Sequence, residues 1–426
     1  MTFDIRKFEK LVSRYLIGSP ALKSILKRVY FRIFRFFGRV FFRAMKSPIH
    51  IETIGAEGVE SFKGYYDVSP ENDNGLIFVY ESSKSTVEKP ASLEQITIAI
   101  YRGSDLTHSV CTISTKAFNW QQGSRAYWLD GERLIFNDYC PDKEIYIAKI
   151  WNVVGDVIEK EIDFAVESKL DKNKYLSINF KRLAALRPDY GYFAHSLSLP
   201  LRSNHGDDGI WIVDIESGKG ELIYSLDDII STPSSSFSDE TEHKLNHLMV
   251  SPDNKHCLVV HRYFANGIRR GRLMLVLLDE RKIIEIPTGG IVSHYCWLSA
   301  DVAVGYVNDA SGILRYYHID IASASLNGIS KLNELNDLSD GDGHPTNVGG
   351  MRFVADTYPN RWGIQKLIYC GRNGETQTLA SMSHGIKYGG ESRCDLHPAF
   401  CAKSGYLYFD SVFSGKRRLY RRKLIF

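Results

Sequence analysis

Short runs of β-branched and aromatic residues, separated by turn residues, fill the chain from residue 48 onward. Residues 49–54 alternate apolar and polar positions, as a half-buried strand does, whereas residues 76–80 and 96–101 are nearly continuous apolar runs. No long amphipathic pattern interrupts these runs. The sequence therefore predicts an all-β protein.

The C-terminal stretch shows the repeating unit most clearly. Residues 389–400 read as a charged loop leading into a short buried strand, residues 406–411 as a second strand, residues 414–416 as a tight turn and residues 418–425 as a third strand. This is the pattern of one β-propeller blade, and weaker copies precede it at residues 76–114, 117–164, 179–230, 243–286, 294–321 and 344–379.

We therefore predict a seven-bladed β-propeller over residues 47–426. Residues 49–54 are expected to close the ring by pairing with the last blade, because closure protects the edges of the sheets. The irregular spacing of the repeats leaves six or eight blades as alternatives. Two polar stretches, residues 231–242 and 333–342, are interpreted as exposed excursions.

The first 46 residues differ from the rest in charge. They hold twelve Lys or Arg and two acidic residues, which leaves 41 basic and 48 acidic residues in the remainder. A helix start at Ser19-Pro20 precedes arginines on one helical face, with apolar residues largely on the other. These arginines are Arg28, Arg32, Arg35, Arg39 and Arg43. We predict a basic amphipathic N-terminal helical extension over residues 1–46, separate from the propeller.

This extension has two interpretations. An arginine every three or four residues excludes a transmembrane span and a signal-peptide core. Residues 20–46 can lie in the headgroup region of an anionic membrane surface, or their apolar face can dock on the propeller. Because the remainder of the chain is acidic, nucleic acid is not expected as a partner.

Seven cysteines without a CxxC pair indicate free thiols in a reducing compartment. The expected location is therefore cytoplasmic, and peripheral at the inner face of the membrane under the membrane interpretation. The chain contains no P-loop, GxSxG, HExxH or GxGxxG motif, which argues against a nucleotide-dependent enzyme.

Histidines recur at or near the start of the predicted innermost strands. Equivalent positions on successive blades face one central funnel, so these residues can meet although they are far apart in sequence. Asp395 lies two residues before the last of them, and an i, i+2 pair on a strand projects to one side. Two imidazoles and a carboxylate suit Mn, Fe, Ni, Co or Zn better than Ca or Mg. For each histidine taken alone, the alternative is that it forms a hydrogen bond to a neighbouring blade and binds no ligand. The four are His247, His294, His344 and His397.

The sequence contexts of these residues are His247 followed by Ser251-Pro252-Asp253, His294-x-x-Trp297, Gly343-His344 and Asp395-x-His397-Pro398. Over residues 180–426 this array resembles the oligogalacturonate lyase family, with its TolB-like propeller repeats. Members of that family are metal-dependent seven-bladed propellers that cleave uronate-containing oligosaccharides by β-elimination.

The resemblance implies a role for each matching residue. His247 stands before the Pro-Asp turn, where the family has its base, and His294 stands in the metal-binding His-x-x-Trp motif. The family's Gln-x-x-His-x-His motif corresponds here to residues 392–397. His397 is retained as a ligand and Asp395, which replaces a histidine, can still bind a metal, but Ser392 is a poor substitute for the glutamine.

A divalent metal, manganese first, is the implied cofactor, and His344 and Arg393 are expected to contact the substrate. Arg262 follows a strand of the His247 blade and is expected to pair with a substrate carboxylate, with a solvated surface arginine as the alternative. A divalent cation stabilises the charge that develops when a neutral imidazole removes the proton next to a uronate carboxylate.

The predicted function is therefore a metal-dependent lyase acting on an acidic oligosaccharide or polysaccharide. The alternative is a non-catalytic propeller, a scaffold or glycan-binding protein in a membrane-associated surface-polysaccharide pathway. The fold alone does not decide between them, because both enzymes and non-catalytic binding proteins are β-propellers.

Overall fold

The computed structural model describes residues 50–196, 204–232, 242–265, 268–321, 330–331 and 341–425. The helical extension expected over residues 1–46, the membrane contact expected for residues 20–46 and most of the two polar excursions lie outside these ranges. Among the described residues, no helix combines the length and the apolar character that crossing a bilayer requires. All seven cysteines are free thiols, as predicted.

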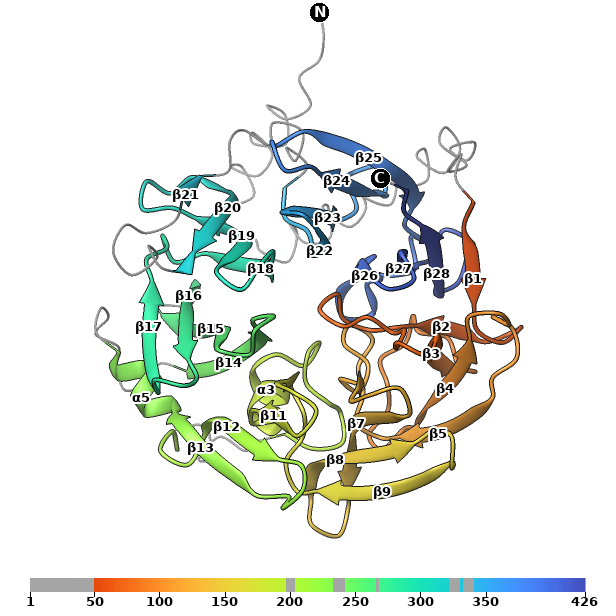
Figure 1. Cartoon of the computed structure of the whole chain (residues 1–426), viewed down its shortest axis with the longest axis horizontal. Helices are drawn as coiled ribbons and strands as arrows, with labels where there is room; N and C mark the ends of the chain where they lie inside the picture. The colour runs from red at the N-terminus through yellow and green to blue at the C-terminus, as the bar shows by residue number, and fades with distance from the viewer. Residues whose placement is uncertain are drawn as a thin grey trace, which may run out of the picture.

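Seven four-stranded sheets are arranged as a ring in the described part of the chain (Figure 1). The prediction of an all-β, seven-bladed β-propeller is confirmed. Blade 1 consists of β2 (Glu60–Phe62), β3 (Leu76–Ser82), β4 (Ile96–Arg102) and β5 (Cys111–Thr115). Blade 2 consists of β6 (Tyr127–Trp128), β7 (Arg133–Cys140), β8 (Ile145–Asn152) and β9 (Val157–Ile162).

Blade 3 consists of β10 (Ser168–Lys169), β11 (Lys174–Ser177), β12 (Gly209–Asp214) and β13 (Gly220–Ser225), with α3 (Phe180–Leu186) and α5 (Leu226–Ser231) in its connections. Blade 4 consists of β14 (Glu242–Val250), β15 (His256–Ala265), β16 (Ile268–Leu277) and β17 (Lys282–Ile286). Blade 5 consists of β18 (Val292–Trp297), β19 (Val302–Asn308), β20 (Leu314–Asp320) and β21 (Ser330–Lys331).

Blade 6 consists of β22 (Pro345–Gly349), β23 (Arg352–Asp356), β24 (Ile364–Cys370) and β25 (Thr376–Ser383). A 3₁₀ turn, η2 (Gly390–Ser392), leads to blade 7, which consists of β26 (Ala399–Cys401), β27 (Tyr406–Ser411), β28 (Arg418–Lys423) and β1 (Glu52–Ile54).

The ring closes where β1 joins β28 (Figure 1). The two strands are antiparallel, with Glu52 opposite Arg421 and Ile54 opposite Leu419. Arg421 Nε also lies 2.9 Å from Glu52 Oε2. The predicted closure by residues 49–54 is therefore confirmed, and the last blade gains its outermost strand from the beginning of the propeller.

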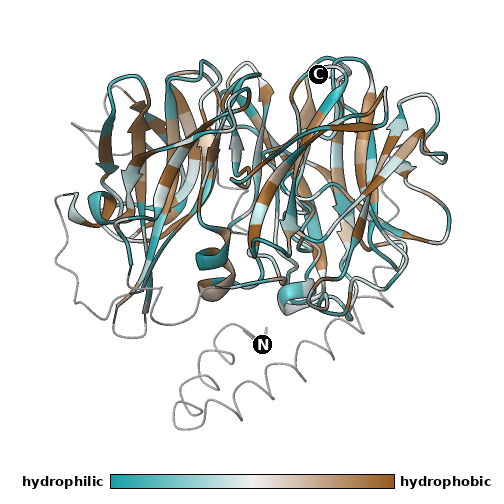
Figure 2. Ribbon diagram, turned by 90° about the horizontal axis from the view of Figure 1, so that it is seen from below, coloured by the Kyte–Doolittle hydropathy of each residue, from teal (hydrophilic) through white to brown (hydrophobic). Residues whose placement is uncertain are grey.

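The core lies between consecutive blades. One cluster joins Ile54 of β1 and Leu419 of β28 to Ile77 of blade 1, and another packs Leu258 of blade 4 against Tyr295 of blade 5. In side view, the strands run between the two faces of the ring, and hydrophilic and hydrophobic residues are mixed along them (Figure 2). Because each blade buries its apolar side chains against the next, the inner strands are fixed relative to one another.

Three expected blade boundaries are wrong. Blade 1 begins with β2, before the expected start at residue 76, and blade 3 begins with β10 and β11, before residue 179. Blade 5 ends with β21, after the expected end near residue 321. Asn179 instead caps α3, because its side chain accepts from Lys181 N and Arg182 N. Strands of two to four residues carry too little periodicity to be recognised in sequence.

Candidate functional site

The four histidines lie at the inner strands of blades 4 to 7. His247 and His294 lie at register shifts in β14 and β18, whereas His344 directly precedes β22 and His397 lies two residues before β26. His247 and His397 have positive φ angles of 58° and 44°. Bulges and left-handed residues re-aim side chains and are found at functional sites more often than elsewhere.

Ring closure brings these four imidazoles together. The centroids of His294 and His344 lie 4.0 Å apart, those of His344 and His397 4.3 Å, and those of His247 and His294 5.6 Å. None of the four residues is more than 4% exposed. We call these residues, together with Asp395, the histidine cluster.

Each of three imidazoles in the cluster is oriented through its Nδ1 atom. His344 Nδ1 lies 2.9 Å from Asp356 Oδ1, and His294 Nδ1 lies 3.1 Å from Asp342 Oδ1. His397 Nδ1 lies 3.0 Å from the carbonyl oxygen of Gly64, to which it must donate. Nδ1 therefore carries the hydrogen in all three rings, and Nε2 of each neutral ring keeps its lone pair.

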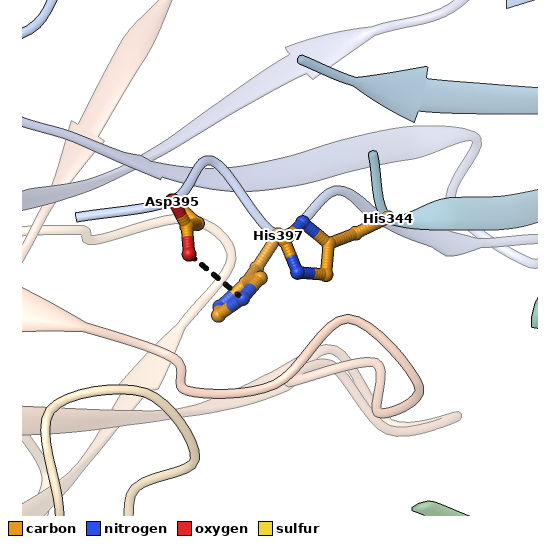
Figure 3. Close-up of side chains that lie close together, drawn as sticks. All are labelled: His344, Asp395 and His397. Carbon is orange, nitrogen blue, oxygen red and sulfur yellow. Dashed lines mark ion pairs between the residues drawn. The ribbon is translucent and has the colours of Figure 1, made fainter. Parts of the chain in front are cut away.

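Two of these Nε2 atoms are buried without a partner. Among the described residues, Nε2 of His344 and Nε2 of His397 have no hydrogen-bond partner. One ligand atom each from His344, Asp395 and His397 lies within 4.8 Å of the others, with Asp395 Oδ2 at 4.0 Å from His397 Nε2 (Figure 3). An anchored Nδ1 and a free Nε2 is the usual arrangement of a histidine that binds a metal.

Asp395 is not a free carboxylate. Arg393 Nε donates to its Oδ1 at 2.7 Å and Arg393 Nη2 donates to its Oδ2 at 2.7 Å, a forked ion pair. Burial alone would raise the pKa of Asp395, but Arg393 holds it well below its usual range. Asp395 is therefore ionised, and Arg393, whose side chain is 30% exposed, packs over the Tyr358 ring.

One carboxylate positions two imidazoles from adjacent blades. Asp356, at the end of β23, accepts hydrogen bonds from His344 N at 2.7 Å and from His344 Nδ1 through Oδ1, and from His397 N at 3.0 Å through Oδ2. It is 2% exposed. Sequence reasoning missed this residue because nothing in its local pattern marks it.

A loop from blade 1 supplies two tyrosines that sequence reasoning also missed. Tyr65 Oη lies 2.5 Å from His247 Nδ1, and the Tyr65 ring lies 5.1 Å from both His247 and His397. The Tyr66 ring lies 5.2 Å from that of His344. Gly64 permits this path, because it has a φ of 92° and an added Cβ would lie 2.7 Å from the Gln122 carbonyl oxygen.

Burial and neighbouring charge set the protonation of the cluster. Burial, reinforced by the neighbouring imidazoles, lowers the pKa of His247, His294 and His397, so these rings are neutral. Burial also opposes the charged form of His344, but Asp356 more than compensates and raises its pKa. Three rings of the cluster are thus neutral nitrogen donors, and His344 binds a proton more readily than an isolated imidazole does.

The predicted site residues occupy one region, with two changes of role. His344, expected to contact substrate, belongs to the group of three with Asp395 and His397, whereas His294, expected as a ligand, lies beside His344. Arg262 Nη2 donates to the carbonyl oxygen of Val292, which brings its guanidinium near the cluster. Ser392 does not reach it, because its hydroxyl donates to the Gly389 carbonyl oxygen.

No family model matches the chain, and no curated protein matches it in sequence. Among solved structures, an oligogalacturonate lyase from Vibrio parahaemolyticus is 12% identical with a TM-score of 0.57, and the match covers 88% of this chain and 97% of that one. The chain shares the fold of an oligogalacturonate lyase. The predicted likeness to this family is therefore confirmed for the fold.

Two further structures are similar at lower scores. The β-propeller domain of the Trilobed protease from Pyrococcus furiosus is 11% identical with a TM-score of 0.47, over 86% of this chain and 94% of that one. An oligogalacturonate lyase in complex with manganese is 10% identical with a TM-score of 0.39, over 89% and 97% of the two chains.

Proposed function

We propose that the protein is a metal-dependent lyase that cleaves uronate-containing oligosaccharides or polysaccharides by β-elimination. The observation that carries this proposal is the pair of buried, unpartnered Nε2 atoms of His344 and His397 beside the ionised Asp395. Buried polar atoms without partners are rare in proteins, and a divalent cation is the ligand that such donors fit.

The donor set fits a divalent transition metal. His344, His397 and Asp395 would hold it, and His294 offers a third imidazole beside them. Mixed nitrogen and oxygen donors favour Mn, Fe, Ni, Co or Zn over Ca or Mg, and manganese is the first ion to test. When bound, the cation would supply positive charge to a uronate carboxylate and so acidify the adjacent C–H bond.

His247 is the proposed base. Its pKa is lowered by burial, so the ring is neutral at neutral pH and can accept a proton. Tyr65 Oη lies 2.5 Å from Nδ1 and 3.0 Å from Nε2 of His247, so the hydroxyl contacts whichever nitrogen acts as the base. His247 takes the proton next to the carboxylate, the electron pair of that C–H bond forms the new double bond, and the glycosidic oxygen leaves with its bonding pair. Arg262 and Arg393 are proposed to face acidic groups of the substrate.

Metal content and product formation test this proposal together. Protein purified without chelator should contain about one divalent ion per chain, which the His344→Ala, His397→Ala double variant should lose. Wild-type protein incubated with oligouronates should generate the ultraviolet absorbance of an unsaturated product, and His247→Ala should not. His384→Ala is the matched control, because His384 is also buried but lies outside the group of three.

A non-catalytic glycan-binding propeller is the second candidate. The ion pair between Arg393 and Asp395 favours it, because the guanidinium already neutralises the carboxylate that a cation would need. Glycan binding without metal and without unsaturated product supports this candidate and contradicts the lyase.

Under both candidates, the proposed location is cytoplasmic, and residues 20–46 are proposed to contact an anionic membrane surface. Flotation with liposomes, comparing the whole chain with one lacking residues 1–46, tests that contact.

A further inference from the structure

Blade 4 contains two buried cations that face each other. Lys244 on β14 is directly opposite Arg262 on β15. Residues opposite each other in an antiparallel pair project to the same side of the sheet, where like charges repel. Lys244 is 1% exposed and Arg262 is 7% exposed. Basic side chains are almost never buried to this degree unless they are paired with an anion.

Within the described residues, neither cation has a carboxylate at ion-pair distance. Lys244 Nζ donates to the carbonyl oxygen of Leu186 at 2.8 Å, and Arg262 Nη2 donates to that of Val292 at 2.9 Å. Arg262 Nε is buried and has no acceptor. An ammonium group has three hydrogens to donate, so Lys244 also has unused capacity.

A third positively charged side chain lies close to Lys244 and Arg262. Arg187 follows α3, and its guanidinium lies 4.3 Å from the centroid of the Tyr190 ring. Asp189 accepts from Arg187 Nε at 2.8 Å and is thus already committed. Burial, followed by the charges of Arg187 and Arg262, lowers the pKa of Lys244 to about 7. These surroundings therefore disfavour the positive charge of Lys244, which a nearby anion would stabilise.

These cations adjoin the histidine cluster. The Tyr190 ring under Arg187 lies 5.4 Å from the His247 ring, edge to face. Val292, the acceptor for Arg262, lies two residues before His294. A ligand bound at the cluster can therefore lie within reach of these cations.

We propose that Lys244 and Arg262, backed by Arg187, form a subsite for a second carboxylate of the acidic ligand. This inference rests on the proposed function for the identity of the ligand. It adds that the ligand presents two adjacent uronate units. One unit reaches the metal-binding end of the cluster and the next reaches Lys244 and Arg262. A carboxylate fits because it can accept from Arg262 Nε and from the free hydrogens of Lys244.

The test compares two acidic probes by isothermal titration calorimetry on metal-loaded His247→Ala protein, which lacks the proposed base and serves as the reference protein. Digalacturonate should bind the reference protein at least about tenfold more tightly than galacturonate does, the effect of one charged hydrogen bond. Added to it, Lys244→Met should remove that advantage and leave galacturonate binding nearly unchanged, Arg262→Met should also remove the advantage, and Lys244→Arg should keep it. Lys169→Met is the matched control, because Lys169 Nζ also donates to backbone carbonyls, those of Trp128 and Leu129.

Thermal denaturation separates this role from a structural one. Replacing a buried charge that lacks a counterion by an apolar side chain of similar length should leave the Tm unchanged or raise it. A marked fall in the Tm of both Lys244→Met and Arg262→Met overturns the proposal, because the cations would then be structural. Equal affinities of the His247→Ala reference protein for the two probes, or no binding of digalacturonate at millimolar concentration, also overturn it.

The same samples distinguish failure of this inference from failure of the proposed function. Metal content should be unchanged in both methionine variants. If wild-type protein holds no metal and forms no unsaturated product, but Lys244→Met still weakens digalacturonate binding, the lyase proposal fails and the subsite stands. If metal and product are present but the two probes bind alike, the subsite alone fails.

Discussion

Substitution of Asp356 tests whether one carboxylate organises the proposed metal-binding end of the histidine cluster. Its two oxygens accept three hydrogen bonds, from His344 N, His344 Nδ1 and His397 N. Asp356→Asn keeps the shape of the side chain but replaces one acceptor by an amide donor. Asp356→Ala removes all three acceptors. Asp356 would not touch the metal, so it is a positioning residue.

The magnitude follows from those three contacts. Each buried donor left without an acceptor costs about 1–3 kcal/mol, and removing one partner of a buried charged network costs about 3–5 kcal/mol. We therefore expect Asp356→Ala to lose about 3–5 kcal/mol of unfolding free energy and Asp356→Asn about 1–2 kcal/mol. Loss of a carboxylate that orients a ligating histidine typically weakens metal binding about 10–100-fold.

Urea denaturation and metal titration by calorimetry measure the two effects separately. Asp208→Asn is the control, because Asp208 is also buried, at 6% exposed, and is paired with Arg182 away from the cluster. The control should lose stability but keep its affinity for manganese. If Asp356→Asn keeps the wild-type affinity as well, Asp356 serves only to hold blades 6 and 7 together and the positioning argument is refuted.

Two further predictions concern stability. Burial raises the pKa of Glu167 to about 7 against the opposing effect of Arg125, so its contribution to stability is complete below pH 4.5 and is lost as the pH rises through 7. Between pH 5 and pH 7, the unfolding free energy of wild-type protein, measured by urea denaturation, should therefore fall relative to that of Glu167→Gln. A difference between the two proteins that does not change with pH contradicts this. Ile54→Ala should cost about 2–5 kcal/mol, because Ile54 is fully buried in the strand that closes the ring, whereas Ile425→Ala, 93% exposed, should change stability by less than about 0.5 kcal/mol. Equal thermal denaturation of these two variants would show that β1 is not needed for closure.

The gathering of the histidines could be predicted because it depends on topology. His247, His294, His344 and His397 all lie in or just before an inner strand, and any closed ring brings such positions together. The closing strand could also be predicted, since residues 49–54 have the alternation of a half-buried strand and no other partner in sequence. Neither prediction requires knowledge of a single side-chain contact.

The partners of these residues could not be predicted, because they are contacts between blades. Asp356 accepts a hydrogen bond from the backbone amide of His397, which is 41 residues away in sequence, and Tyr65 is 182 residues from His247. The pairing of Lys244 with Arg262 depends on the register of β14 and β15, which a bulge near His247 shifts. The loop that carries Tyr65 follows β2, a strand of three residues with no detectable period.

The charges of the cluster imply that a metal and an acidic ligand bind cooperatively. Asp342 and Asp356 each accept a hydrogen bond from an imidazole of the cluster, and Asp395 is paired with Arg393. Because Arg393 offsets the charge of Asp395, the one carboxylate among the three proposed ligands, a uronate carboxylate bound beside the cation would supply further negative charge next to it. Because coupling between two ligands is reciprocal, galacturonate should tighten manganese binding by the same factor as manganese tightens galacturonate binding, about 5–150-fold. Calorimetric titration of each ligand in the presence and absence of the other measures both factors. Independent binding would mean that the acid does not approach the metal, and it would remove the electrostatic basis for the proposed elimination.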